Sequence, residues 1–157
     1  MTKTFYRTIL LVAAVSFCGI FSSVKAQNVS GFIANGSVTR GTPAQATVVL
    51  SVPGGLHVNS NRPSSEYAIP TTVRATARGV KIGRISYPRG KNRKFDFSEN
   101  AINVYDGSTT FRFNITVPQT FAAKTVAVRV VVNYQACTNE VCYPPKTKEF
   151  TMKANVR

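Results

Sequence analysis

The stretch TTFRFNITV, residues 109–117, decides the class of fold. Its phenylalanines and aliphatic residues occupy every second position, and the positions between them are polar or charged. The stretch VAVRVVVNY, residues 126–134, repeats this alternation with a valine or tyrosine at every second position. Because successive side chains of a strand point to opposite faces, a period of two predicts two strands that each bury one face.

Other short runs rich in β-branched and aromatic residues predict further strands, separated by clusters of Pro, Gly, Asn and Ser. These predicted strands cover residues 29–34, 46–52, 56–59, 71–77, 81–87, 102–105 and 148–153. No segment beyond the start of the chain carries a convincing helical stripe. Many short strands in a chain of this length indicate an antiparallel β-sandwich. An antibody-type domain is disfavoured, since the inter-sheet cysteine pair and the Trp of that class are absent.

The beginning of the chain has the pattern of a cleavable secretory signal peptide over residues 1–26. A basic, acid-free start is followed by an almost wholly apolar run at residues 9–21, and Ala26 precedes the expected cleavage point. The apolar run, about 13 residues long, is shorter than the roughly 20 that span a bilayer, so a retained membrane anchor is the weaker alternative. Cys18 follows a bulky residue, which disfavours lipoprotein processing, and we assign it to the discarded peptide.

Cleavage after Ala26 would leave residues 27–157 as one β-sandwich domain in a compartment where disulfides persist. The net charge would fall from +14 to +11, because three basic residues leave with the peptide. Cys137 and Cys142 would remain beside a single histidine, a set too small for a typical structural zinc site. No phosphate-binding glycine loop, Ser-His-Asp set or pair of carboxylates indicates a cofactor or hydrolytic chemistry.

The two cysteines stand in the segment YQACTNEVCYPPK, residues 134–146, directly after a predicted strand. Four residues separate them, so a hairpin or tight loop would bring the sulfur atoms within reach of a disulfide. A ring this small stabilises by roughly 2 kcal/mol, less than a long-range bridge would. Two functions stay open: a dithiol that exchanges with a partner, with Pro144 and Pro145 shaping a docking surface, or an inert clip across a hairpin.

This segment resembles the active-site segment of the amino-terminal periplasmic domain of the transmembrane thiol:disulfide interchange reductase DsbD. That family shows Tyr-Gln-x-Cys, a short insert, and then Cys-Tyr/Leu-Pro-Pro. The stretch GGLHVNSNRPSSEYAIPTTV, residues 54–73, is similar to a strand of that domain and its Pro-bearing continuation. Parts of residues 87–107 are similar to the loop that lies over the cysteines. The matches follow the family's order and cover most of residues 54–148.

The resemblance implies an immunoglobulin-like sandwich whose cysteine pair relays reducing equivalents in the periplasm. A thioredoxin-like protein or domain would donate them, and a periplasmic disulfide isomerase or a cytochrome-maturation thioredoxin would accept them. By the same resemblance, Cys142 forms the mixed disulfide with the partner and Cys137 resolves it. An aromatic cap shields the pair in that family, and Phe97 is the candidate here, with Phe95 second.

Three more residues are expected to lie around the cysteine pair. Tyr143 and Pro144 follow it in the chain, and His57 assists if the fold brings it near, the alternative being a surface or capping histidine. The chain departs from the family in its insert of four residues, and in His57 and Asn59, where some members carry tyrosines. We also expect it to lack that family's membrane-spanning and thioredoxin-like parts, so that its electron donor is a separate protein.

The segment Arg78–Lys94 holds seven basic residues and no acid. Such a block could contact nucleic acid, an acidic partner or the anionic envelope surface, or be simply solvated. Nucleic acid is disfavoured, because a secreted chain rarely meets it and no stacking aromatics are interleaved with the block. The second hypothesis of function is therefore a non-catalytic sandwich that binds a protein or the envelope surface through this basic face and keeps a structural disulfide.

Overall fold

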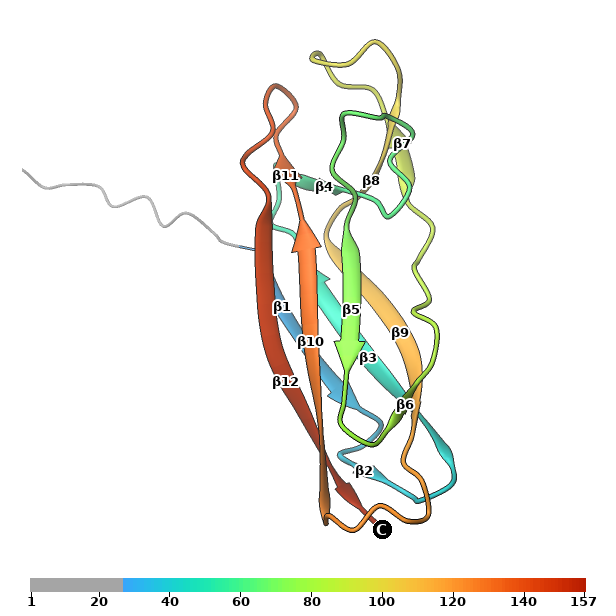
Figure 1. The fold of residues 1–157 in the computed structure, drawn as a ribbon. Helices are drawn as coiled ribbons and strands as arrows, with labels where there is room; N and C mark the ends of the chain where they lie inside the picture. The colour runs from blue at the N-terminus through green and yellow to red at the C-terminus, as the bar shows by residue number, and fades with distance from the viewer. Residues whose placement is uncertain (1–26) are drawn as a thin grey trace, which may run out of the picture.

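Two four-stranded sheets pack face to face in residues 27–157, the part of the chain that the computed structural model describes (Figure 1). The first sheet has the order β1 (Asn28–Ile33), β3 (Pro43–Ser51), β9 (Ser108–Thr116) and β6 (Lys81–Ile82). The second has the order β2 (Ser37–Val38), β12 (Lys146–Val156), β10 (Thr125–Tyr134) and β5 (Thr72–Thr76). Neighbouring strands are antiparallel except β2 and β12, which are parallel.

A third, smaller sheet closes one end of the sandwich (Figure 1). Its order is β11 (Ala136–Cys137), β4 (His57–Asn59), β8 (Ile102–Tyr105) and β7 (Lys91–Arg93). Since β11 begins two residues after the end of β10, the cysteine segment extends a central strand of the second sheet. The small sheet is therefore positioned by the sandwich beneath it.

The core forms between the two main sheets from the faces that the alternation predicts. On β9, Phe111, Phe113 and Ile115 are buried, whereas Arg112 is exposed. On β10, Val126, Val128, Val130, Val132 and Tyr134 are each at most 1% exposed. Buried side chains from the other strands of both main sheets, except the short β6, belong to the same cluster, so the sheets are joined by a continuous apolar layer.

The predicted all-β sandwich is confirmed, and each predicted strand overlaps an observed one. The prediction over residues 81–87 is wrong in length, because only Lys81 and Ile82 pair as a strand there. Beyond them the backbone of the segment pairs with β9 at single points, through the Gly83 amide and the Ser86–Arg112 bridge, and the Tyr87 ring packs edge-on against Phe111. The sequence does not predict β2, β7 or β11, since each has only two or three residues and lies outside the longer runs of β-branched and aromatic residues.

Within residues 27–157, no helix has the length and apolar character that a membrane span requires. The signal peptide predicted over residues 1–26, with Cys18, lies outside the described residues. The signal peptide therefore stays a prediction.

Phe111→Ala should lower the free energy of unfolding by about 3–5 kcal/mol, because the side chain is fully buried and its removal opens a cavity between the sheets. Phe32→Ala is the matched control, since Phe32 is 56% exposed and its loss should cost within about 0.5 kcal/mol. Urea unfolding followed by circular dichroism measures both values. Equal effects of the two substitutions would contradict the assigned core.

Candidate active site

Cys137 and Cys142 form a disulfide across the tight loop that their spacing predicts, with the two Cα atoms 3.9 Å apart. Backbone hydrogen bonds shape this loop, since the Thr138 amide donates to the Val141 carbonyl at 2.8 Å. The Thr138 hydroxyl oxygen accepts from the amides of Glu140 and Val141 at 3.2 and 3.0 Å. The loop is thus closed by hydrogen bonds of its own in addition to the disulfide.

The exit from the loop runs back along the entry strand. The Tyr143 amide donates to the Ala136 carbonyl at 2.8 Å, and the Gln135 side-chain amide donates to the Tyr143 carbonyl at 3.2 Å. Pro144 has no N–H, so the residue after Tyr143 cannot extend this pairing. Tyr143 and Pro144 directly follow Cys142 and are exposed, and their role around the pair stays a prediction.

The two cysteines differ in their access to solvent. Cys137 is fully buried, whereas Cys142 is partly exposed and lines an open cleft of about 590 Å³. We call this cleft the cysteine cleft. Its other walls come from two loops, one residue of β8 and two residues with side-chain amides: Ser64–Ala68, Phe97–Asn100, Ile102, Asn59 and Gln135. A reagent that enters the cleft therefore meets Cys142 first.

Two side-chain amides hold the segments around the disulfide together. Asn59 is 2% exposed, and its Nδ2 donates to the Ile69 carbonyl and to Gln135 Oε1, each at 3.1 Å. Gln135 Oε1 also accepts from the Ile69 amide at 3.4 Å, and the Thr71 hydroxyl donates to the Asn59 carbonyl at 2.6 Å. Strand β4, the loop at Ile69 and the cysteine hairpin are thereby joined in one network.

The role of Gln135 is not predicted from the sequence, although the residue lies inside the cysteine motif. The signal that could have found it is its position, because a long amide directly after a buried strand can reach a neighbouring loop. Asn59 is expected only as a departure from the family, and its structural role depends on the pairing of β4 with β11.

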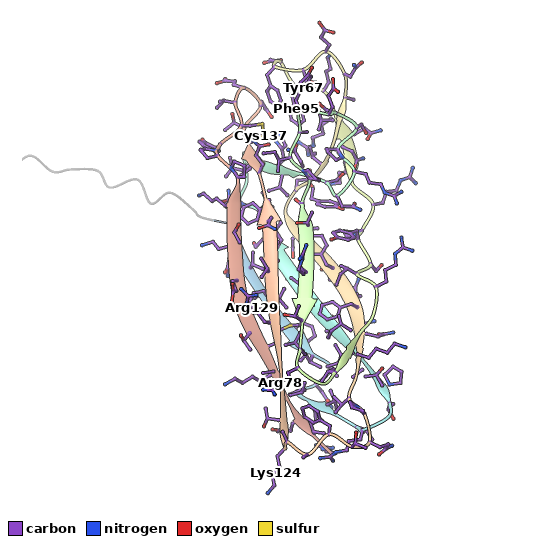
Figure 2. The ribbon with its side chains drawn as sticks, in the orientation of Figure 1. Tyr67, Arg78, Phe95, Lys124, Arg129 and Cys137 are labelled. Carbon is purple, nitrogen blue, oxygen red and sulfur yellow. A yellow bond between two sulfur atoms is a disulfide. The ribbon has the colours of Figure 1, made fainter. Side chains whose placement is uncertain are left out.

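An aromatic stack lies over the small sheet at the disulfide end, where Figure 2 labels Phe95 and Cys137. The His57 ring stacks on Phe95 at 4.1 Å between centroids, and Phe95 stacks on Phe97 at 5.3 Å. Phe95 is 3% exposed and belongs to a small second core, whereas Phe97 is 41% exposed and lines the cysteine cleft with Cys142. The position of Phe97 fits the predicted cap, and the capping role stays a prediction.

His57 is a buried residue rather than a surface one, and its Cα is paired with that of Cys137 across β4 and β11. Burial lowers the pKa of His57 to about 4, and the positive charge of Arg93 acts in the same direction, opposed by Asp106. Its Nε2 atom has no hydrogen-bond partner among residues 27–157. At neutral pH the ring beside the cysteine strand is therefore uncharged.

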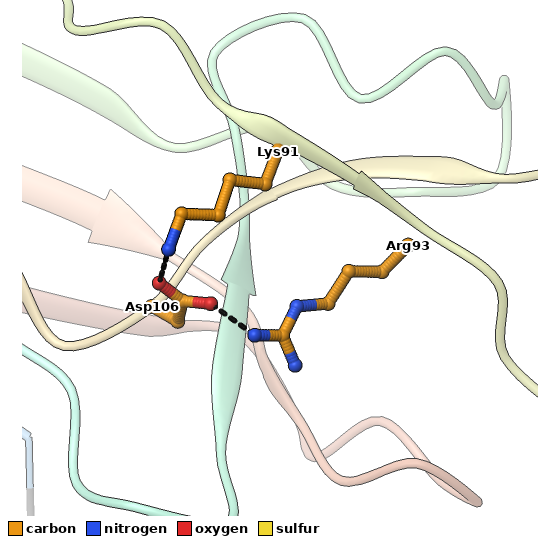
Figure 3. Close-up of polar contacts among 3 residues, drawn as sticks. All are labelled: Lys91, Arg93 and Asp106. Atoms are coloured by element: carbon orange, nitrogen blue, oxygen red, sulfur yellow. Dashed lines mark hydrogen bonds and ion pairs between the residues drawn. The ribbon is translucent and has the colours of Figure 1, made fainter.

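Asp106 partly neutralises the basic segment that approaches this end. Lys91 Nζ donates to one carboxylate oxygen at 3.0 Å and Arg93 Nη2 to the other (Figure 3). The hydrogen bond from Lys91, together with the charges of both cations, holds the pKa of Asp106 below its usual range. Although Arg78–Lys94 contains no acid, the fold thus supplies one from the turn after β8.

Residues 31–154 match the family model of the thiol:disulfide interchange protein DsbD, N-terminal. The chain is also 28% identical over 81 residues to the thiol:disulfide interchange protein DsbD of Actinobacillus pleuropneumoniae. That alignment covers 52% of this chain and 13% of the relative, so the chain spans only a small part of that protein's length.

Two solved structures resemble the fold. The N-terminal domain of Neisseria meningitidis DsbD in the reduced form has a TM-score of 0.50 at 18% identity, over 81% of this chain and 85% of that one. The N-terminal periplasmic domain of ScsB from Proteus mirabilis has a TM-score of 0.49 at 11% identity, over 81% and 44% of the two chains. The first of these matches confirms the predicted immunoglobulin-like sandwich.

His57→Phe should remove an acid-dependent loss of stability. With the folded-state pKa of His57 lowered to about 4 from 6.5, the unfolded chain binds the proton more readily, so the wild type loses stability as the pH falls from 6.5 toward 4. The variant keeps a ring to stack on Phe95 and does not titrate. Urea unfolding of both oxidised proteins at pH 7, 5.5 and 4.5 measures the difference. Parallel stability curves over this range would contradict a buried, neutral His57.

Proposed function

This chain belongs to the family of the N-terminal domain of the thiol:disulfide interchange protein DsbD, and we propose that it relays reducing equivalents through Cys137 and Cys142. One observation supports this function above the others: Cys142 lines an open cleft, whereas Cys137 is buried directly behind it. Thiol–disulfide exchange needs one reachable sulfur and a second one held next to it. The hydrogen-bonded loop meets both needs.

The relay proceeds in two exchanges from the reduced protein. The Cys142 thiolate attacks the partner's disulfide, forming a mixed disulfide and releasing one partner sulfur, which takes up a proton. The Cys137 thiolate then attacks the Cys142 sulfur, and the second partner sulfur leaves as a thiol. The partner gains two electrons and two protons, and the Cys137–Cys142 disulfide is formed again. A dithiol donor reduces it by the reverse sequence.

The partners of this relay are thioredoxin-like. We infer a thioredoxin-like protein or domain as the donor, and a periplasmic disulfide isomerase or a cytochrome-maturation thioredoxin as the acceptor. Residues 1–26 would direct the chain across the inner membrane and be removed, leaving residues 27–157 as the working domain in the periplasm. This placement suits the chemistry, because disulfides persist in that compartment.

The redox potential separates this function from a sandwich with an inert clip. Equilibration of the protein against ratios of reduced and oxidised dithiothreitol, followed by alkylation of free thiols, gives the midpoint. A midpoint near that of thioredoxin, about −270 mV, supports the relay, whereas one below about −300 mV indicates a structural disulfide.

Cys137→Ser should give a stable mixed disulfide with a thioredoxin whose second active-site cysteine is replaced by Ser and whose reactive cysteine is activated as a 2-nitro-5-thiobenzoate disulfide. Cys142→Ser should react at least about tenfold more slowly, because the remaining sulfur is buried. Absorbance of released thiobenzoate gives the rates, and non-reducing electrophoresis identifies the adduct. In urea both variants should react alike, which shows that each thiol is intact. Equal rates for the folded variants would contradict the assignment of Cys142 as the attacking cysteine and Cys137 as the resolving one.

Phe97→Ala should speed the reduction of the disulfide by dithiothreitol by about three- to tenfold, because the ring forms part of the cleft wall beside Cys142. Phe32→Ala, which removes an exposed ring from β1, is the matched control and should leave the rate unchanged. Stopped-flow alkylation of the released thiols measures both rates. An unchanged rate in Phe97→Ala would show that Phe97 does not shield the disulfide.

A further inference from the structure

A second cleft lies next to the cysteine cleft and is lined by three arginines, Arg62, Arg84 and Arg89. This arginine cleft has a volume of about 750 Å³ and shares Ser64 with the cysteine cleft, so the two hollows adjoin. Arg62 comes from the loop after β4, and the other two come from the segment between β6 and β7. Residues more than twenty positions apart in sequence thus line one hollow.

The three arginines have no acidic partner within residues 27–157. The ion pairs formed in this part of the chain use other cations, namely Lys91 and Arg93 on Asp106 and Arg129 on Glu149. Like charges gathered in a hollow repel each other, and the concave wall focuses their potential on whatever enters. Such a site favours an anionic group, and guanidinium groups bind carboxylates in a bidentate geometry.

The walls of the arginine cleft are held in place before any ligand arrives. The buried Tyr105 hydroxyl oxygen lies 2.7 Å from Asn61 Oδ1 and 3.2 Å from the Pro88 carbonyl oxygen, so it joins the residues that precede Arg62 and Arg89. The Ser86 amide, between Arg84 and Arg89, donates to the Arg112 carbonyl at 2.7 Å. Both cationic segments are therefore attached to strands of the main fold.

A glycine permits the close approach of these two walls. A Cβ atom at Gly90 would lie 2.0 Å from Asn103 Oδ1 and 3.0 Å from the Ser60 Cβ. The segment that carries Arg89 lies close against β8 and the loop after β4, and a side chain at Gly90 would have to displace the Asn103 amide. The hollow is a built feature of the fold rather than a gap between mobile side chains.

We propose that the arginine cleft binds a carboxylate-rich segment of the thioredoxin-like partner while a cysteine of that partner engages Cys142. This inference rests on the proposed relay and names the surface that selects the partner. Because the clefts adjoin, a protein docked over Cys142 extends across the arginines. A short acidic segment there gains charge-assisted hydrogen bonds that a neutral one does not.

The charges beside the disulfide favour a protein over a lipid bilayer as the occupant. Glu66 and Glu99 line the cysteine cleft, so the docking surface is acidic beside Cys142 and basic one cleft away. A uniformly anionic bilayer that met the arginines would bring like charge toward these carboxylates. A protein can present a cation to one cleft and carboxylates to the other.

Activated peptides of equal length test the proposal with the reduced protein in excess. Each peptide carries one cysteine as a 2-nitro-5-thiobenzoate disulfide, followed by a Gly-Ser spacer and a tail of three Glu or three Gln, with spacers of several lengths. The Cys142 thiolate attacks the peptide sulfur and releases thiobenzoate, whose absorbance gives the rate. At low salt, the Glu-tailed peptide should react at least about tenfold faster at the best spacer length, and added salt should reduce this ratio.

Two triple variants with the same change of net charge locate the effect. Arg62→Gln/Arg84→Gln/Arg89→Gln should bring the Glu-to-Gln rate ratio near one. The control is Arg78→Gln/Lys124→Gln/Lys153→Gln, whose residues are exposed and belong to the main sheets and their loops. This control should keep the rate ratio of the unsubstituted protein. Figure 2 shows Arg78 and Lys124 far from the end that holds Cys137. Circular dichroism and urea unfolding verify that both variants are folded.

The outcomes separate this inference from the proposed function. If the folded protein reacts with neither peptide although its thiols react in urea, the relay itself fails. If both peptides react at equal rates, or if both triple variants lower the ratio alike, the acidic docking site is wrong and the relay stands. Arginine-dependent sedimentation with phosphatidylglycerol vesicles, together with a rate ratio of one, would assign the cleft to a bilayer and overturn the proposal.

Discussion

Burial of one face of β9 and one face of β10 in the same core is the constraint on which the rest of the structure depends. Each buried phenylalanine or valine contributes about 1.5–3 kcal/mol, and these two strands supply many of the fully buried side chains. A register shift of one residue would turn every apolar side chain of a strand toward solvent. The end of β10 is therefore fixed in space, and it fixes the start of the cysteine hairpin that follows it in the chain.

Hydrogen bonds hold the same chain reversal that the disulfide closes, so the shape of the hairpin does not depend on that bond alone. Thr138 closes the turn, Tyr143 pairs back to Ala136, and the amides of Asn59 and Gln135 join the hairpin to its neighbours. A six-residue ring adds only roughly 2 kcal/mol, so little stability is lost when the bond is reduced. A disulfide that adds so little stability is better suited to reversible exchange than to a purely structural role.

Charge is distributed unevenly over this basic protein. The cysteine cleft carries Glu66 and Glu99, whereas the adjoining hollow carries three arginines with no acidic partner in the described residues. The ring of His57, an uncharged residue of β4, stacks on Phe95, and Phe95 stacks on Phe97 at the cysteine cleft. Access to Cys142 is thus bordered by apolar, acidic and basic surfaces in turn, a pattern that can discriminate among thiol-redox partners.

The sequence by itself determined what depends on local spacing: the long alternating strands, the turns between them, the loop that joins Cys137 to Cys142, and the motif that indicates thiol exchange. These features are readable because period and spacing act within a few residues of the chain. The very short strands and the difference in burial between the two sulfurs could not be predicted. Nor could the pairing of Asp106 with Lys91 and Arg93, or the hollow that joins Arg62 to Arg84 and Arg89. Only the tertiary structure decided these, because each arises where segments distant in sequence are packed together by the sandwich core.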